Sequence, residues 1–120
     1  MNVTANVVPP MIGISLDKDS IDFGDVIPCG NSSLIPVGIY NISSPGFGVN
    51  VTAQVQGNAT AQDFYGQSLY ISGAQYNPAS VIANISSGSS QSVVTQLRVP
   101  CSWNTNGSQT ATIIFWASKS

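Results

Sequence analysis

Apolar and polar residues alternate strictly over positions 49–55, so that one face of this segment is aliphatic and the other is polar. The aliphatic face consists of Val49, Val51, Ala53 and Val55. A period of two residues is typical of a β-strand with one buried and one solvent-facing side. The pattern therefore predicts a strand whose intervening residues, Asn50 among them, point outward.

Similar short runs of β-branched and aromatic residues recur along the chain, separated by Gly, Pro, Asn and Ser. They predict further strands at residues 11–16, 21–23, 34–40, 69–72, 81–85, 91–99 and 110–118. No stretch keeps a helical period, and Asn106-Gly107 indicates a hairpin loop before the last strand. Seven to eight short strands joined by tight turns predict an all-β fold, an antiparallel β-sandwich in residues 11–120.

Residues 1–10 form a separate segment. Val3, Ala5 and Val7 alternate with other residues, and Pro9-Pro10 then separates this segment from the body as a stiff spacer without amide donors. A strand held away from its domain can fold back onto its own sheet. It can also add to an exposed sheet edge of a neighbouring copy.

The last predicted strand is apolar on both faces. Ile113 and Phe115 lie on one face, and Ile114 and Trp116 lie on the other. A strand with one solvated face would alternate instead, so this strand is expected to contact something on both sides. An internal loop over Ile114 and Trp116 is one explanation.

We favour a second explanation, in which these four residues line an acceptor groove that the segment 1–8 of another copy fills as a donor strand. A bare apolar edge promotes aggregation, and an incoming strand would cover it. Head-to-tail addition is an open contact that propagates into a filament. The expected partner is therefore a second copy of this chain.

Charged residues make up only 7% of the chain, with three basic side chains, five acidic ones and no His, against an average near 25%. This composition excludes a basic nucleic-acid surface and His-based metal sites or catalysis. No apolar run reaches the roughly 18–20 residues of a membrane span. We expect no enzyme activity, no cofactor, no nucleic-acid partner and no membrane span.

Seven Asn-X-Ser/Thr triplets offer acceptors for N-linked glycans, at Asn2, Asn31, Asn41, Asn50, Asn58, Asn84 and Asn106. Chance placement of the ten Asn residues would give roughly two such triplets in this Ser/Thr-rich background. The excess predicts a glycoprotein, whose glycans supply the hydration that charges do not. The alternative is a compositional accident in a polar β protein.

Two cysteines, Cys29 and Cys101, predict one disulfide and therefore an oxidising, extracellular location. Two separate buried thiols are the alternative. The first residues lack a basic stretch followed by an apolar one, so we expect the sequence to be a mature form without a signal peptide.

Residues 12–30, which read IGISLDKDSIDFGDVIPCG, resemble the opening of secreted Ig-like domains of archaea and bacteria, with Cys29 standing before the usual Gly. Residues 111–117 are similar to the closing strand of such domains. Together with the acceptors, the low charge and the Pro-separated arm, they make the chain resemble the glycosylated thread-type filament subunits of thermoacidophilic archaea. The resemblance implies a pilin-like sandwich that assembles by donor-strand complementation into cell-surface filaments for adhesion or biofilm formation.

Two other functions fit the same residues. One is a monomeric cell-surface or S-layer-associated adhesion domain, whose own N-terminal strand completes its sheet. The other is a structural protein of an archaeal virus.

Four of the five acidic residues, Asp17, Asp19, Asp22 and Asp25, lie within nine positions. Calcium prefers several carboxylate oxygens, but the spacing is not that of an EF-hand, so we favour a solvated turn. The sequence contains no Gly-X-Ser-X-Gly turn and no His, so it gives no support for nucleophilic catalysis.

The scarcity of carboxylates predicts tolerance of acid, because protonation destabilises a fold mainly through ionised groups whose pKa differs between the folded and unfolded states. We expect the melting temperature to fall by less than about 10 °C between pH 7 and pH 3, where 1 kcal/mol corresponds to roughly 4–8 °C. Thermal unfolding followed by circular dichroism measures this shift. Loss of the folded state at pH 3 would contradict the expectation.

Overall fold

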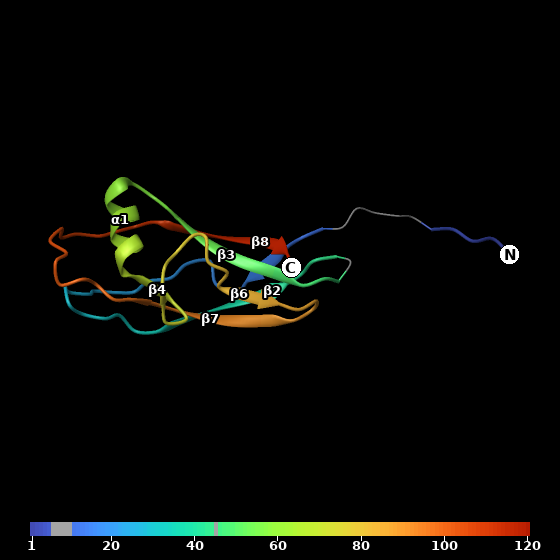
Figure 1. The fold of residues 1–120 in the computed structure, drawn as a ribbon, viewed down its shortest axis with the longest axis horizontal. Helices are drawn as coiled ribbons and strands as arrows, with labels where there is room; N and C mark the ends of the chain where they lie inside the picture. The colour runs from blue at the N-terminus through green and yellow to red at the C-terminus, as the bar shows by residue number, and fades with distance from the viewer. Residues whose placement is uncertain (6–10, 45) are drawn as a thin grey trace.

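The structure, a computed structural model, describes residues 1–5, 11–44 and 46–120. The described residues form eight strands and one helix (Figure 1). These are β1 (Ile14–Leu16), β2 (Ile35–Asn41), β3 (Val49–Gln56), α1 (Ala59–Ser68), β4 (Leu69–Ile71), β5 (Ala74–Gln75), β6 (Ala83–Ile85), β7 (Ser90–Leu97) and β8 (Thr112–Lys119).

The strands form two antiparallel sheets that pack on one another. The first has five strands in the order β1-β2-β7-β4-β5, and the second has three strands in the order β6-β3-β8. The longest ladders join β2 to β7 and β3 to β8. The predicted antiparallel β-sandwich is thus confirmed at the level of its two sheets.

Alternating residues of the central strands meet between the sheets and make the core. In β3 the predicted pattern is confirmed, since its four aliphatic residues are all buried and Asn50 faces outward. The facing strands contribute Val37, Ile39, Val93, Thr95 and Leu97. Thr95 is tolerated in the core because its hydroxyl donates a hydrogen bond to the carbonyl of Ile35 at 2.8 Å.

The helix α1 corrects the expectation that no segment is helical. Asn58 caps its first turn, since the side-chain Oδ1 accepts a hydrogen bond from the Ala61 amide at 2.8 Å. One narrow stripe of the helix is buried, made by Ala61, Phe64 and Ser68. Because the rest of the helix is polar and includes Gly66, its apolar period was too weak to predict a helix.

Two further predictions are wrong. Residues 21–23 form no strand, because the structure gives them no neighbouring strand with which to pair. The chain around Asn106-Gly107 is not a hairpin, because β7 and β8 belong to different sheets and the loop crosses between them. The short strand β5, which pairs with β4, was not predicted at all.

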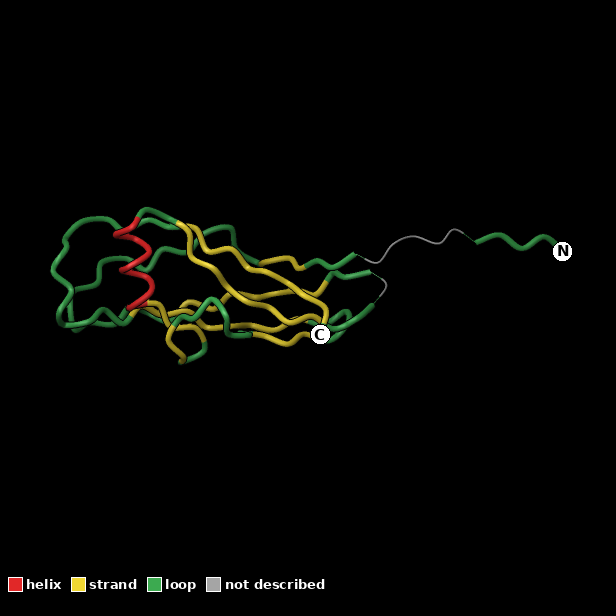
Figure 2. The backbone as a smooth tube through the Cα atoms, turned by 45° about the horizontal axis from the view of Figure 1, so that its top comes forward, coloured by secondary structure: helices red, strands yellow, loops and turns green. Residues whose placement is uncertain are grey.

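The two sheets differ in their number of strands, and α1 covers the excess of the wider sheet on one side only. α1 lies against β3, β4 and β5, at one end of the molecule (Figure 2). It therefore covers the part of the five-stranded sheet that the three-stranded sheet leaves bare near β4 and β5. Near β1, on the other side, the described residues provide only irregular chain.

Replacing the helix cap tests whether α1 depends on Asn58. We expect Asn58→Ala to lower stability by about 1 kcal/mol, because the first turn loses its acceptor. Asn58→Ser is the control. Serine keeps an acceptor oxygen for the first turn, and it removes the glycan triplet just as alanine does. Equal loss in both variants, measured by urea unfolding, would show that the cap is not the cause.

Candidate functional site

Strand β8 lies at the edge of its sheet and pairs with β3 alone. Val55 lies opposite Ile113 and Ala53 lies opposite Phe115 in this ladder. Alternate backbone amides and carbonyls of an edge strand point away from the sheet without a ladder partner. Within the described part of the chain, no strand occupies the second edge of β8.

The inner side of β8 borders an open apolar groove. A cavity of about 290 Å³ lies between β8 and the loop that follows β1. Ile113 and Phe115 line it from β8, and Leu16, Ile21 and Phe23 line it from the opposite side. The groove therefore lies along the inner side of β8, and Tyr65 of α1 also contributes to its lining.

A second and wider cavity of about 750 Å³ continues from the first toward the end of the molecule that carries the disulfide. Both cavities share Ile21, Phe23, Tyr65, Thr110 and Ala111. The wider part is lined by the loop around residues 21–28 and by the loop that precedes β8. The two cavities thus form one groove that opens at this end.

The groove lining is less well covered than the rest of the core. Ile113, Phe115, Ile21 and Phe23 are only partly buried, although they pack against the core cluster. By contrast, Val49 on the neighbouring strand is fully buried. The inner side of β8 is therefore an apolar row that remains partly exposed along a sheet edge.

Ile114 and Trp116, which we expected to contribute to the groove, lie on the outer face of β8. Side chains of a strand alternate between its two faces, so only Ile113 and Phe115 can line the inner side. Trp116 is 55% exposed, and its Nε1 donates a hydrogen bond to Gln54 Oε1 at 3.1 Å. The two faces of β8 therefore belong to two different surfaces.

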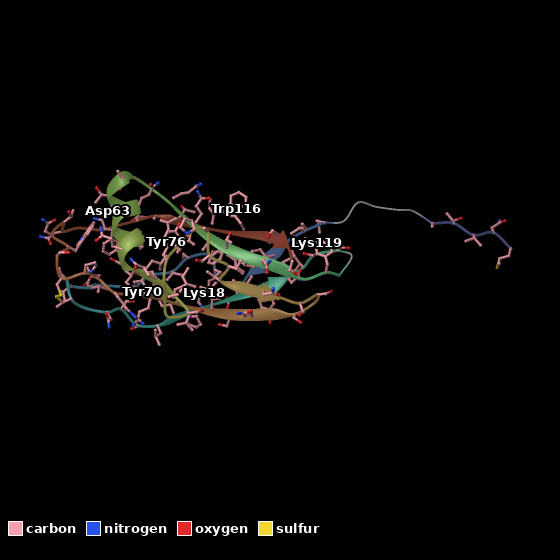
Figure 3. All side chains as sticks on the ribbon, in the orientation of Figure 1. Lys18, Asp63, Tyr70, Tyr76, Trp116 and Lys119 are labelled. Carbon is pink, nitrogen blue, oxygen red and sulfur yellow. A yellow bond between two sulfur atoms is a disulfide. The ribbon has the colours of Figure 1, made fainter. Side chains whose placement is uncertain are left out.

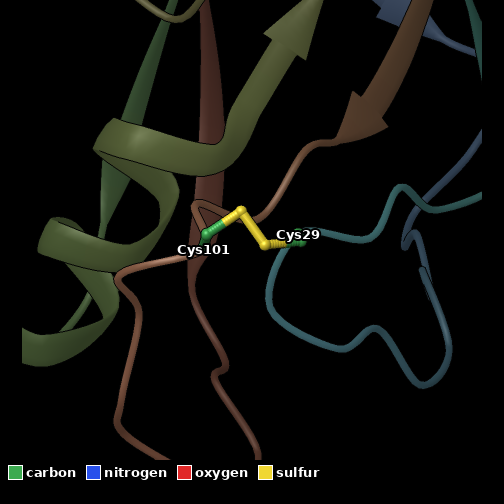
Figure 4. Close-up of a disulfide and its surroundings, with 2 residues drawn as sticks. All are labelled: Cys29 and Cys101. Carbon is green, nitrogen blue, oxygen red and sulfur yellow. A yellow bond between two sulfur atoms is a disulfide. The ribbon is translucent and has the colours of Figure 1, made fainter.

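The predicted disulfide between Cys29 and Cys101 is present (Figure 4). It joins the loop that walls the groove to the turn after β7. Two backbone hydrogen bonds, both of 3.0 Å, support the same junction. The Cys29 amide donates to the Val99 carbonyl, and the Val99 amide donates to the Gly30 carbonyl. One wall of the groove is thus fixed to the five-stranded sheet.

The N-terminal residues 1–5 form no strand and are exposed throughout, with Val3 83% exposed. Val7 falls among residues 6–10, outside the described residues. Met11 forms an isolated bridge with Ser44, which fixes where the arm meets the body. Figure 1 shows the N-terminus beyond the end of the sandwich where the C-terminus lies, opposite the end with α1.

Five of the seven candidate glycan acceptors are exposed, at Asn2, Asn31, Asn58, Asn84 and Asn106. Asn50 is partly buried and Asn41 is buried. The predicted acceptors are therefore spread over the arm, the body and the loop before β8. That any of these residues carries a glycan stays a prediction.

The structure argues against Asn41 as an acceptor. Its Nδ2 donates to the carbonyls of Phe47 at 2.7 Å, Ile85 at 3.1 Å and Ser86 at 3.3 Å, and only 6% of the residue is exposed. A glycan on this nitrogen would have to break into a buried hydrogen-bond network. Asn41 instead ties the end of β2 to the opposite sheet.

Acidic residues near the groove serve local contacts. Asp17 Oδ1 accepts a hydrogen bond from the Gly38 amide at 2.8 Å, and its Oδ2 lies 3.9 Å from Lys18 Nζ. Asp22 Oδ1 accepts from the Gly24 amide at 2.8 Å. Across the residues that the structure describes, no group of three or more His, Cys, Asp or Glu could hold a metal ion.

Tyr65 stands where the two cavities meet, and its hydroxyl donates to the carbonyl of Gln109. Burial raises the pKa of this hydroxyl above its ordinary value, and the negative charge of Asp22 adds to the rise. The neutral phenol is therefore favoured in the folded state. The contact holds the loop before β8 against the helix that carries Tyr65.

The helix α1 is too short to cross a bilayer, and the described residues contain no other helix. Comparisons with protein-family models, curated proteins and solved structures find no match to this chain.

The raised pKa of Tyr65 predicts a loss of stability in alkali. A group whose folded pKa is higher than its unfolded pKa stabilises the fold below the unfolded pKa, and this contribution is lost as the pH rises through the folded one. We expect the melting temperature to fall above about pH 10, and to fall less in Tyr65→Phe. The control is Tyr40→Phe, because Tyr40 is exposed. Identical alkaline profiles for the two variants, measured by differential scanning calorimetry, would contradict this assignment.

Proposed function

We propose that this protein is the structural subunit of an extracellular, N-glycosylated filament of the pilus or thread type. The N-terminal strand of one copy inserts beside β8 of the next and completes its Ig-like sandwich. The observation that carries the proposal is the half-exposed apolar row of β8 next to a groove and an unpaired strand edge. The filament would serve adhesion, biofilm formation or surface attachment.

The chemistry of the arm suits the groove. Val3, Ala5 and Val7 alternate along the arm, so in an extended arm they would share one apolar face, and the groove offers the apolar side chains of Ile113 and Phe115. Burying a valine side chain contributes about 1.5–3 kcal/mol, and each backbone hydrogen bond to the open edge adds about 0.5–1.5 kcal/mol. The arm and the edge thus offer complementary apolar and hydrogen-bonding surfaces.

The position of the two features favours exchange between copies. Figure 1 shows the arm beyond the end where β8 finishes. The groove reaches the opposite end of β8, near the disulfide, where Pro28 and Trp103 line it. An arm that enters from a neighbour at the open end would run antiparallel to β8. An arm that folded back onto its own body would run parallel to β8 instead.

The remaining features support an extracellular location. Disulfides persist in oxidising compartments, and Cys29 and Cys101 are joined. Glycans on the exposed acceptors would keep a polymer of weakly charged subunits hydrated. Asn31, Asn58 and Asn84 are not part of the groove lining, whereas Asn106 lines its wider part, so a glycan on Asn106 would stand beside the inserted strand.

A single charge on the arm tests the insertion. We expect Val3→Asp to leave monomers, because a carboxylate would be buried in the apolar groove, and deletion of residues 1–8 to do the same. Asn6→Asp is the matched control: it adds the same charge at an outward position of the alternating arm and removes no glycan triplet. Filaments seen by electron microscopy with Val3→Asp, or with the truncated chain, would refute the proposal.

Engineered cysteine pairs test the direction of the arm. With Asn2→Cys, we expect a disulfide between two copies to form with Ser118→Cys and not with Thr112→Cys, because an antiparallel arm brings its first residues to the end of β8. A link within one chain to Thr112→Cys would show that the arm folds back. Non-reducing electrophoresis and peptide mass spectrometry separate these two outcomes.

A further inference from the structure

The outer face of the three-stranded sheet carries an exposed aromatic ring beside a glycan acceptor. Asn84, Asn50 and Ser118 form one row across β6, β3 and β8, because Asn50 pairs with both of the others. The next row contains Thr52 opposite Trp116. Asn50 and Trp116 are thus diagonal neighbours on adjacent strands, at about 7–8 Å between their backbones.

Trp116 presents its ring to solvent in a fixed orientation. It is 55% exposed and stands clear of the ribbon in Figure 3. Its Nε1 donates to Gln54 Oε1 at 3.1 Å, which restrains the indole on the sheet. The other tryptophan, Trp103, is half-buried and packs on Phe64 with ring centroids 5.0 Å apart. The indole of Trp116 is equally large and apolar, but it is not covered in the way that Phe64 covers Trp103.

The side-chain amide of Asn50 is oriented by its neighbour on β6. Asn84 Nδ2 donates a hydrogen bond to Asn50 Oδ1 at 2.8 Å. Because the oxygen of the planar amide is turned toward β6, its nitrogen points away from that strand. The nitrogen that a glycan would occupy therefore lies on the same outer face as Trp116, one row along that face from the ring.

We propose that Asn50 carries an N-linked glycan whose first sugars lie over the indole of Trp116. One face of a pyranose ring is lined by C–H groups, which pack on the electron-rich face of an aromatic ring. This inference rests on the proposed glycosylation. Asn84 acts as a positioning residue through its hydrogen bond, and a glycan starting from Asn84 would begin one strand farther from the ring.

The experiment uses the full chain secreted by a host that adds N-glycans. Glycopeptide mass spectrometry first determines whether Asn50 is modified. Hydroxyl-radical footprinting then measures the oxidation of Trp116, with Trp103 as the internal standard. Asn50→Asp removes the glycan but keeps the oxygen that accepts from Asn84. Thr52→Val removes the same triplet, keeps Asn50 itself and keeps a side chain of the same shape opposite Trp116.

We expect oxidation of Trp116 to rise about twofold or more in both variants, because the sugar covers the one ring face that the sheet leaves open. The matched control is Ser86→Ala, which removes the Asn84 triplet and leaves both amides in place. It should leave Trp116 protected. Unchanged oxidation in Asn50→Asp and Thr52→Val would overturn the proposal.

Two other outcomes would also overturn it. If Asn50 is found unmodified, no glycan from this residue can cover Trp116 and the proposal fails. The proposed strand insertion does not depend on this result, because the arm variants test it separately. Protection of Trp116 only in assembled filaments, with or without the Asn50 glycan, would show that a second copy covers the ring.

Discussion

A β-sandwich closes its core only where each sheet covers the other, and here a three-stranded sheet faces a five-stranded one. The helix α1 makes up the difference near β4 and β5. Near β1 the described residues place only a loop beside β8, and the inner residues of β8 are only partly buried. The groove, its apolar lining and the free strand edge all follow from this difference in width.

Strands with a clear inside and outside could be predicted from the sequence. The segment around Val51 alternates strictly because one side contacts the core and the other contacts water, and the burial pattern of β3 confirms this arrangement. The helix was missed because only a narrow stripe from Ala61 to Ser68 is buried, and Asn58 reads equally well as a cap and as a glycan acceptor. A strand at residues 21–23 was expected because apolar alternation describes a buried face, whereas a strand also needs a partner.

The candidate site was predictable in part. The two-sided apolar pattern singled out a strand that lies at the edge of its sheet, yet it could not tell which face lines a cavity and which meets solvent. That distinction depends on the register with β3, which sets Ile113 and Phe115 inward and Trp116 outward. In the same way, the triplet at Asn41 looks like the others until its amide is found hydrogen-bonded to three carbonyls.

The disulfide divides the chain in a way that matters when its two ends are pulled apart. The covalent loop from Cys29 to Cys101 contains β2 to β7, whereas β1 and β8 lie outside it. Under tension, the chain before Cys29 and the chain after Cys101 can be drawn out while the bond holds, whereas the residues between the two cysteines cannot. The two strands that flank the groove can therefore yield first and take up the stretch, while the interior of the domain is shielded from the load.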